Sequence, residues 1–477
     1  MPRGRIALGL IFVFLITYGW FFQGGGWNQN SRFDVVRALV EQHTLAITAF
    51  AANTGDVSHQ GAEVYSSKPP GPSVLAAPLY AAARTVERAS GIEPASPYAQ
   101  TGNAHLVTWA VAGVPAALLV ALLFLYLAEV TGDERQALSM AAAFGAGSLA
   151  LPYSGVLMNH LLVAFGLFAA WLALEAGRPT RSGLIGGGAA LGVALFSEYL
   201  TLPLIALYAL VWWHRRPELG RDAALFWVGP ALGVAALLGL QLVMFGSPFT
   251  LTYDNQNPAF VDQGLAFGMV GVPDPRRIWW LTLQPYRGLF WSSPMLALAV
   301  LGPGRIHGRR RAAFCLAMVG YFLLFNLAFK NWPGGWGFGP RYLIPALPFL
   351  FVLTADAWKR FALARSVAVA LSVVFMLAAA TTLVMVPGPD GGGPPPPGRD
   401  PVLETLELAA GGAVSVNPQA IFENLPGPSR DPAVDDRWDS YNVGELLGLE
   451  GIWSVLPVVL LMAGGVLALG RAAKRTS

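Results

Sequence analysis

The sequence predicts an all-α polytopic membrane protein, and two observations carry this prediction. The 477 residues are 54% hydrophobic and only 12% charged, with a mean hydropathy of +0.50, whereas a soluble domain carries about 25% charged residues. Many apolar runs of roughly 17–25 residues are long enough to cross about 30 Å of hydrocarbon as a helix. The formal net charge of +3 is small, so the distribution of charge along the chain is more informative than its total.

About twelve apolar runs are candidates for transmembrane helices. They lie at about 5–22, 103–130, 137–152, 156–176, 183–197, 200–213, 223–245, 288–304, 312–329, 341–357, 366–386 and 453–470. One run contains Gly188 and Gly192, a G-x-x-x-G spacing that favours close packing of two helices in a membrane.

The basic residues are unevenly distributed between the connecting segments. If the N-terminus lies in the cytoplasm, 18 of the 31 lysines and arginines fall in the two termini and the short connections on that side. The positive-inside rule therefore predicts that both termini are cytoplasmic. The segments left outside are long, at about 23–102, 246–287 and 387–452, with a shorter one at 331–342. We therefore expect the protein to work at its outer face.

A proline- and glycine-rich stretch, PGPDGGGPPPPGRDP, begins at residue 387 and divides the chain. Such a composition does not form regular helix or sheet. We expect a transmembrane module at 1–386, with a first outer loop at 31–102 and a second at 246–287. The outer loop at 387–452 should be loosely ordered and could act as a lid. Residues 453–477 should form the last transmembrane helix and a basic cytoplasmic tail.

The first outer loop begins with SRFDVVRALVEQHTLAI at 31–47, which has the rhythm of an amphipathic helix. Ser31 can cap a helix that starts at Arg32. We expect this helix to lie in the membrane interface with its acids toward water. Its apolar stripe consists of Phe33, Val36, Leu39 and Val40, and its charged side consists of Asp34, Arg37 and Glu41.

The rest of this loop predicts turns, a stiff stretch and a second surface helix. NTGD at 53–56 and HQG at 59–61 are turn signals. YSSKPPGP at 65–72 should be extended, because each proline disfavours helix in the residue before it. An apolar helix at about 72–88 follows, and the alternation of charge keeps it on the outer side.

These motifs resemble a known family. An acid on a surface helix after the first span, then a K-P-P stretch and another surface helix, is similar to the GT-C superfamily of glycosyltransferases that use lipid-phosphate sugars. The chain resembles its family-39 protein mannosyltransferases and lipid A aminoarabinose transferases. NQNSRFD, NTGD, YSSKPPG, PYRGLFWSSP and GGWGFGPRYLIPALPFL resemble a bacterial branch of this group, and the resemblance extends to about residue 386.

The resemblance implies an enzyme of a bacterial plasma membrane that acts at the outer face. A polyprenyl-phosphate sugar would be the donor. An acceptor hydroxyl on a glycan, lipid or protein would attack the anomeric carbon with inversion, and the lipid phosphate would leave. Such a reaction needs a carboxylate beside the acceptor and cations on the phosphate. We expect no cofactor and no nucleic-acid partner.

Asp34 and Asp56 are the candidate catalytic acids. Asp34 matches the position of the family's catalytic aspartate, although the family often has an acidic pair where this sequence has Phe33 and Asp34. The alternative is that Asp34 only stabilises the helix N-terminus beside Ser31, which would lower its pKa. Asp56 could act as a second carboxylate, or could only bond to its own turn.

Four basic residues are candidates for holding the donor phosphate. Arg287 and Arg341 each lie beside a turn rich in glycine, proline and aromatic residues. An arginine can bind phosphate oxygens in a bidentate manner and stays charged at any pH. Lys68 and Lys330 are the other two candidates. The alternative for each is a side chain that only reaches toward the membrane interface.

Polar and aromatic residues at the outer ends of the predicted spans complete a candidate substrate pocket. Polar groups at such positions are often functional. The alternatives are local hydrogen bonding for the histidine and membrane-interface anchoring for the tryptophan. The pocket candidates are Tyr65, Asn159, His160, Glu198, Trp336 and Tyr342.

The sequence also bears on a metal site and on two alternative functions. No clustered metal-binding motif occurs, so we expect no metal, although Asp34, Asp56 and Glu198 could assemble a divalent-metal site in three dimensions. One alternative function is a transporter or flippase for a lipid-linked glycan. Another is a transferase like the O-antigen ligases, which takes such a glycan whole. Long outer loops and the lack of broken-helix symmetry in the sequence count against transport.

Overall fold

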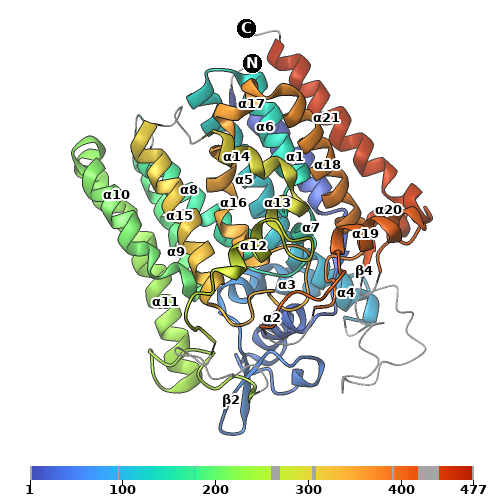
Figure 1. The fold of residues 1–477 in the computed structure, drawn as a ribbon. Helices are drawn as coiled ribbons and strands as arrows, with labels where there is room; N and C mark the ends of the chain where they lie inside the picture. Colours follow the sequence, from blue (N-terminus) through green and yellow to red (C-terminus); the bar gives the residue numbers. More distant parts are fainter. Residues whose placement is uncertain are drawn as a thin grey trace.

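The computed structural model describes residues 3–94, 96–175, 177, 179–258, 269–302, 308–388, 392–416 and 440–474. The long helices form a bundle with both termini at one end (Figure 1). The surface helices α2 (Trp27–Arg37) and α3 (Gly71–Ala89) and the strand β2 (Val57–Gln60) lie at the opposite end (Figure 1). We call these the terminal end and the loop end. The side of the membrane on which each end lies stays a prediction.

The helices of the bundle vary in length. The longer ones are α1 (Arg3–Tyr18), α4 (Pro97–Thr108) continued by η3 (Trp109–Gly113) and α5 (Val114–Thr131), α6 (Glu134–Gly147), α8 (His160–Glu175), α9 (Arg181–Ser197), α10 (Leu204–Leu219), α11 (Val228–Phe245), α15 (Gly308–Ala328), α18 (Ala362–Thr381) and α21 (Leu456–Lys474). The shorter ones are α7 (Ala150–Ser154), η4 (Tyr199–Thr201), η5 (Gly220–Trp227), α12 (Arg276–Thr282), α13 (Leu289–Ser292), η7 (Pro294–Ala297), α14 (Leu298–Leu301), η9 (Arg341–Ala346), α16 (Leu347–Val352) and α17 (Ala355–Arg360).

Within the described residues, five helical runs are long and apolar enough to cross a membrane. They are Tyr98–Thr131, Tyr199–Phe245, Gly308–Ala328, Ala362–Thr381 and Leu456–Ala473. Other predicted spans are shorter or broken. The span predicted at 288–304 is divided into α13, η7 and α14, where Pro294 removes a backbone donor. The prediction of a helical membrane protein is therefore confirmed, and the count of about twelve spans stays a prediction.

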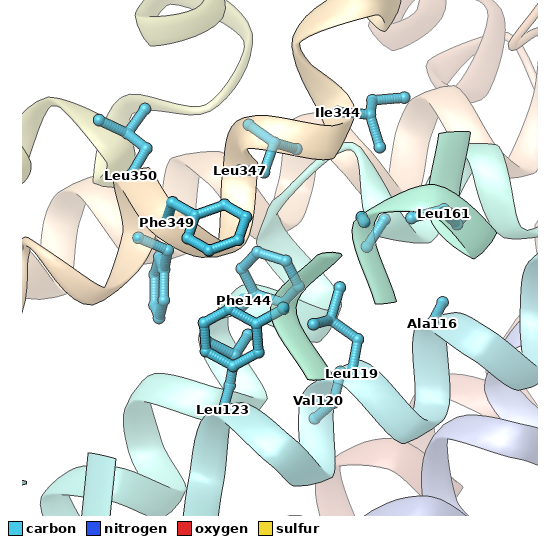
Figure 2. Packing of buried hydrophobic residues seen from close by; sticks show 14 of the residues in the cluster. Ala116, Leu119, Val120, Leu123, Phe144, Leu161, Ile344, Leu347, Phe349 and Leu350 are labelled. Atoms are coloured by element: carbon cyan, nitrogen blue, oxygen red, sulfur yellow. The ribbon is translucent and has the colours of Figure 1, made fainter. Parts of the chain in front are cut away.

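The apolar core lies where α5, α6, α8 and α16 meet. Leu119 and Leu123 of α5 are completely buried, and Phe144 of α6 is 1% exposed. Figure 2 shows these side chains converging with Phe349 of α16. Because helices are rigid, this packing also fixes the positions of their ends at the loop end.

The predicted close packing at the G-x-x-x-G pattern is confirmed between α9 and α11. A Cβ atom on Gly188 would lie 2.0 Å from the carbonyl oxygen of Phe226, and one on Gly192 would lie 2.2 Å from that of Gly229. The two backbones therefore touch directly, which only glycine permits.

Two small antiparallel sheets lie outside the bundle, so the all-α prediction is wrong in this detail. β2 (Val57–Gln60) pairs with β3 (Glu63–Ser66), and Gly61 makes the predicted turn with a positive φ of 61°. β1 (Phe21–Gln23) pairs with β4 (Ser440–Asn442). Strands of three or four residues give too little alternation for sequence patterns to detect.

The segment at 387–452, predicted to be loosely ordered, contains α19 (Pro401–Ala410), β4, α20 (Val443–Leu446) and η12 (Gly451–Ser454) in its described parts. Gln23, the last residue of β1, joins this segment and the residues just before it to the N-terminal part of the chain. Its side chain accepts from the backbone N–H of Val384 at 2.6 Å and of Met385 at 2.8 Å, and donates to the carbonyl of Val416 at 3.0 Å. The prediction of loose order is wrong for these parts. Residues 389–391 and 417–439 lie outside the described residues.

We expect Gly192→Leu to lower the melting temperature of the detergent-solubilised protein, because overpacking of this kind costs about 1–3 kcal/mol or more. Gly186→Leu is the matched control, since a Cβ atom there meets nothing within 4 Å. Differential scanning fluorimetry checks the difference. Equal melting temperatures for the two variants would contradict direct backbone contact between α9 and α11.

Candidate functional site

The first surface helix, α2 (Trp27–Arg37), begins one turn earlier than predicted. Gly26 precedes it, so Ser31 does not cap the helix start. The Ser31 hydroxyl instead donates to the carbonyl of Asp56 at 2.7 Å. Asp34 consequently lies in the third turn of the helix, and the alternative that it only caps the N-terminus is wrong.

Side-chain hydrogen bonds join α2 to the predicted turn at 53–56. Asn30 donates to the carbonyl of Asn53 at 2.9 Å, and Thr54 donates to the carbonyl of Trp27 at 2.8 Å. The Ser31 bond to Asp56 extends this contact. The turn therefore lies along one face of α2 and brings two acids, Asp34 and Asp56, to the same part of the molecule.

The Asp34 carboxylate is buried rather than turned to water. Its residue is only 1% exposed, so the predicted outward orientation is wrong. Oδ1 accepts from the Asn53 side-chain amide at 3.3 Å, and Oδ2 has no hydrogen-bond partner. Burial raises the pKa of Asp34 to about 8, although the Asn53 hydrogen bond and the Arg37 charge oppose the rise.

Asp56 is in a different electrostatic environment from Asp34. Its Oδ1 forms an ion pair with the Lys68 ammonium at 2.9 Å, and both side chains are mostly buried. The predicted extended stretch places Lys68 here, since the two prolines after it separate β3 from α3 (Gly71–Ala89). Asp34 lacks a direct cationic partner of this kind among the described residues.

The second surface helix brings this loop against the bundle. At its first residue a Cβ atom on Gly71 would lie 2.4 Å from the carbonyl oxygen of Phe196, near the end of α9. Only glycine permits this approach. Because Lys68 precedes this contact by three residues, the ion pair is held near the junction of α9 and η4, where Glu198 lies.

Glu198 and Asn159 meet at that junction. The Asn159 side-chain amide donates to the carbonyl of Ser197 at 2.7 Å and to Oε2 of Glu198 at 2.9 Å. Both residues are buried. His160 follows at the start of α8, and its ring packs edge-on against Tyr342 with centroids 5.6 Å apart. Three helix ends thus contribute polar groups to one place.

Arg341 reaches this place from the glycine-rich turn before η9. Gly334 and Gly339 have φ values of 78° and 63°, which favour glycine. The Arg341 guanidinium is buried; Nη1 donates to the carbonyl of Trp336 at 3.2 Å, and Nε has no partner. Arg341 therefore retains donor capacity inside the protein.

We call these converging residues the polar cluster. It consists of Arg32, Asp56, Lys68, Asn159, His160, Glu198 and Arg341. The charges of Arg341, Arg32 and Lys68 are near enough to act on His160. Sequence analysis predicted six of the seven members, and the structure brings those six together.

Arg32 is the member that sequence analysis missed. It is 3% exposed, Nε donates to Asn28 at 2.9 Å, and Glu198, Asp56 and Arg341 are near enough to influence its charge. Burial lowers the pKa of the Arg32 guanidinium, and the two carboxylates oppose this. Tyr253, also missed, lies close enough to act on Arg32 as well. Its position two residues before the candidate catalytic residue Asp34 was the one sequence signal that could have identified Arg32 as a site residue.

The polar cluster has an excess of positive charge. Arg32, Lys68 and Arg341 contribute three cations, and Asp56 and Glu198 contribute two carboxylates. Interactions between charges are stronger here than in water, because the surroundings have a low dielectric constant. One further anion would neutralise the excess, so this arrangement suits an anionic ligand.

Arg287 has a different environment from Arg341. Its side chain is completely buried, and it donates to the carbonyls of Pro333, Tyr286 and Gly335, each at 3.2 Å. Burial lowers the pKa of its guanidinium. Two of its donors therefore hold the turn at 333–335, which precedes Arg341.

The remaining candidates lie around the cluster or away from it. The Tyr65 ring on β3 packs edge-on against Phe245 at 5.5 Å. Trp336 is half-buried and supplies a carbonyl to Arg341. The Lys330 backbone donates to the carbonyl of Met269 at 2.8 Å. Within the described residues, Asp34, Asp56 and Glu198 do not form a metal-binding group.

Comparisons with known proteins identify the fold. No protein-family model matches the chain, and no curated protein matches its sequence. The structure is similar to the crystal structure of ArnT from Cupriavidus metallidurans bound to undecaprenyl phosphate. The TM-score is 0.50 and the identity 13%, over 99% of this chain and 75% of that chain. The chain therefore shares the fold of that membrane protein, and membership of the GT-C superfamily or of a family within it stays a prediction.

The raised pKa of Asp34 predicts a pH-dependent stability. The folded protein holds this proton up to about pH 8, whereas the unfolded chain loses it near the ordinary value of 3.8. This contribution to stability is therefore greatest below pH 3.8 and is lost as the pH rises toward 8. We expect the melting temperature of Asp34→Asn to rise relative to wild type as pH increases through this window. A difference that does not change with pH would contradict the buried, protonated carboxyl.

Arg287→Gln should destabilise the protein, because it removes charged donors from three buried carbonyls, at a cost of about 3 kcal/mol or more. Arg341→Gln should lower the melting temperature less, since Arg341 has one unpartnered donor. Scanning fluorimetry of both variants measures the contrast. An Arg287→Gln protein as stable as wild type would show that the turn at 333–335 does not need this arginine.

Proposed function

We propose that this protein is an inverting glycosyltransferase that moves a sugar from a polyprenyl-phosphate donor to an acceptor hydroxyl at the outer face of a bacterial plasma membrane. The observation that carries the proposal is the buried, net-positive polar cluster at the loop end of a membrane bundle. The fold supports it, because the similar ArnT structure has undecaprenyl phosphate bound. The charge distribution supports placing the loop end outside.

The three cations of the polar cluster would hold the donor phosphate. Arg341 has a buried Nε–H without a partner, which a phosphate oxygen would satisfy. Lys68 could exchange Asp56 for the phosphate, and Arg32 lies near both. Cations placed beforehand around a leaving phosphate stabilise the negative charge that develops when its bond to the sugar breaks.

Asp34 would serve as the proton acceptor. Its pKa of about 8 lies close to a working pH near neutrality, where a general base is most effective. In the reaction the acceptor oxygen forms a bond to the anomeric carbon, and its proton passes to Asp34. The bond from that carbon to the phosphate oxygen breaks, and the phosphate keeps the electron pair. Asn159, Glu198 and Tyr342 would line the sugar pocket.

Two variants separate this function from transport of a lipid-linked glycan. In Asp34→Asn we expect undecaprenyl phosphate binding to be retained and surface glycosylation in the producing bacterium to be abolished. In Arg341→Gln we expect binding to fall by tenfold or more, in line with about 1.5–3 kcal/mol for a charged hydrogen bond. Binding is measured by native mass spectrometry, and the glycans by mass spectrometry of the cell surface.

Arg276→Gln is the matched control for Arg341→Gln, because Arg276 is an exposed arginine at the loop end that pairs with Asp274. It should change neither readout. A flippase would tolerate Asp34→Asn, so retained glycosylation in that variant would overturn the proposed role of Asp34. Undecaprenyl phosphate binding that is equal in Arg341→Gln and wild type would overturn the assignment of the phosphate site.

A further inference from the structure

Two neighbouring oxygen atoms beside α2 are buried without a hydrogen-bond donor. They are Oδ2 of Asp34 and Oδ1 of Asn53, and no partner is found for either among the described residues. The two side chains are joined directly, since the Asn53 amide donates to the other carboxylate oxygen of Asp34 at 3.3 Å. In the ionised form of Asp34, which accepts the proton in the proposed reaction, both oxygens are buried acceptors without a donor. Each costs about 1–3 kcal/mol, so a ligand that donates to both would be favoured.

The fold fixes both oxygens in place. Asn30 donates to the Asn53 carbonyl at 2.9 Å, and Thr54 bonds to the Trp27 carbonyl at 2.8 Å. These bonds position the single turn η2 (Ala51–Asn53) on the edge of α2, where Asn30 and Asp34 follow each other at a spacing of four residues. The positions of Asp34 and Asn53 are therefore fixed by α2 and by the hydrogen bonds that hold the turn against it.

The nearby donors are used elsewhere. Arg37 lies one turn after Asp34, but its Nε is directed to Glu41 at 3.4 Å and its guanidinium covers the Phe50 ring at 4.0 Å. Lys68 is paired with Asp56 at 2.9 Å. Neither of these cations therefore supplies a donor to the two oxygens.

The turn that covers this pair is the accessible side of the site. No residue of η2 is buried, and Ala52 is exposed. The polar cluster, by contrast, is enclosed by the ends of α8 and α9 and by α3. Donor phosphate and acceptor would thus approach α2 from different directions.

We propose that Asp34 and Asn53 form the acceptor subsite, and that it takes a sugar or polyol carrying two adjacent hydroxyl groups. This inference rests on the proposed function. One hydroxyl donates to Oδ2 of Asp34, gives up its proton there and bonds to the anomeric carbon, while the bond from that carbon to the donor phosphate breaks and the phosphate leaves with the electron pair. The second donates to Oδ1 of Asn53 and does not react. Asn53 is thus a positioning residue for the acceptor.

The chemistry of the pair selects against other acceptors. A lone alcohol, such as a serine or threonine side chain, satisfies one oxygen and leaves the other unpaired, which costs affinity. A carboxylate or phosphate brings no hydrogen to either oxygen and is repelled by ionised Asp34. An ammonium group could donate to both, but has no lone pair with which to attack the sugar.

The test compares two small probes that differ by one hydroxyl, cis-cyclohexane-1,2-diol and cyclohexanol. Their binding to the full chain in lipid nanodiscs is measured by saturation-transfer NMR. We expect the diol to bind about fivefold more tightly, the equivalent of one net hydrogen bond of about 1 kcal/mol. Asn53→Leu should abolish this preference, and Asn53→Ser, which keeps a hydroxyl acceptor, should retain part of it.

Asn255→Leu is the control, because Asn255 is exposed and its side chain donates to Gln60 at 3.3 Å, away from Asp34 and Asn53. It should keep the full preference. Equal binding of the two probes to wild type, or a preference that survives in Asn53→Leu, would overturn the inference. Undecaprenyl phosphate binding is measured on the same samples. If it is present while the diol preference is absent, this inference alone fails; if undecaprenyl phosphate does not bind, the proposed function fails.

Discussion

The hydrogen bonds between α2 and residues 53–56 are the constraint on which the rest of the site depends. Asn30, Ser31 and Thr54 each join a side chain to a backbone carbonyl across this contact. Such bonds fix the position of the turn along α2, because each one pairs a particular residue of the helix with a particular residue of the turn. They place Asn53 beside Asp34 and leave Asp56 to pair with Lys68. Asp34 and Asp56 therefore lie in the same part of the molecule but have different environments.

The buried charges of the polar cluster depend on ion-pair or hydrogen-bond partners. Arg32, Asp56 and Glu198 are each less than 9% exposed, and an isolated ion at such a place would be strongly disfavoured. Each carboxylate has a partner, in Lys68 or Asn159. The cations outnumber the carboxylates by one, and Arg341 keeps an unpartnered donor. Such a site is incomplete without an anion, which distinguishes it from a purely structural network.

Sequence patterns predicted the membrane class, the surface helices and most members of the cluster, because each depends on local composition or on a short motif. They failed where the answer depends on contacts between distant segments. Ser31 has the chemistry of a cap, yet its hydroxyl bonds to Asp56, and Asp34 is consequently buried. Arg287 and Arg341 have similar sequence surroundings, but Arg287 is the one whose guanidinium donates to carbonyls of the turn at 333–335. The short strand β4 has no detectable period.

The pairing of β1 with β4 has a consequence for how the protein is made. The two strands belong to opposite ends of the chain, so ribosomal synthesis delivers β1 early and its partner almost last. The hydrogen bonds of the Gln23 side chain likewise form only after residues 384, 385 and 416 have been synthesised. Loop closure over such a separation is slow and entropically unfavourable. The edge of β1 therefore stays unpaired until the C-terminal segment has been synthesised, and a chain interrupted before β4 would leave that edge open.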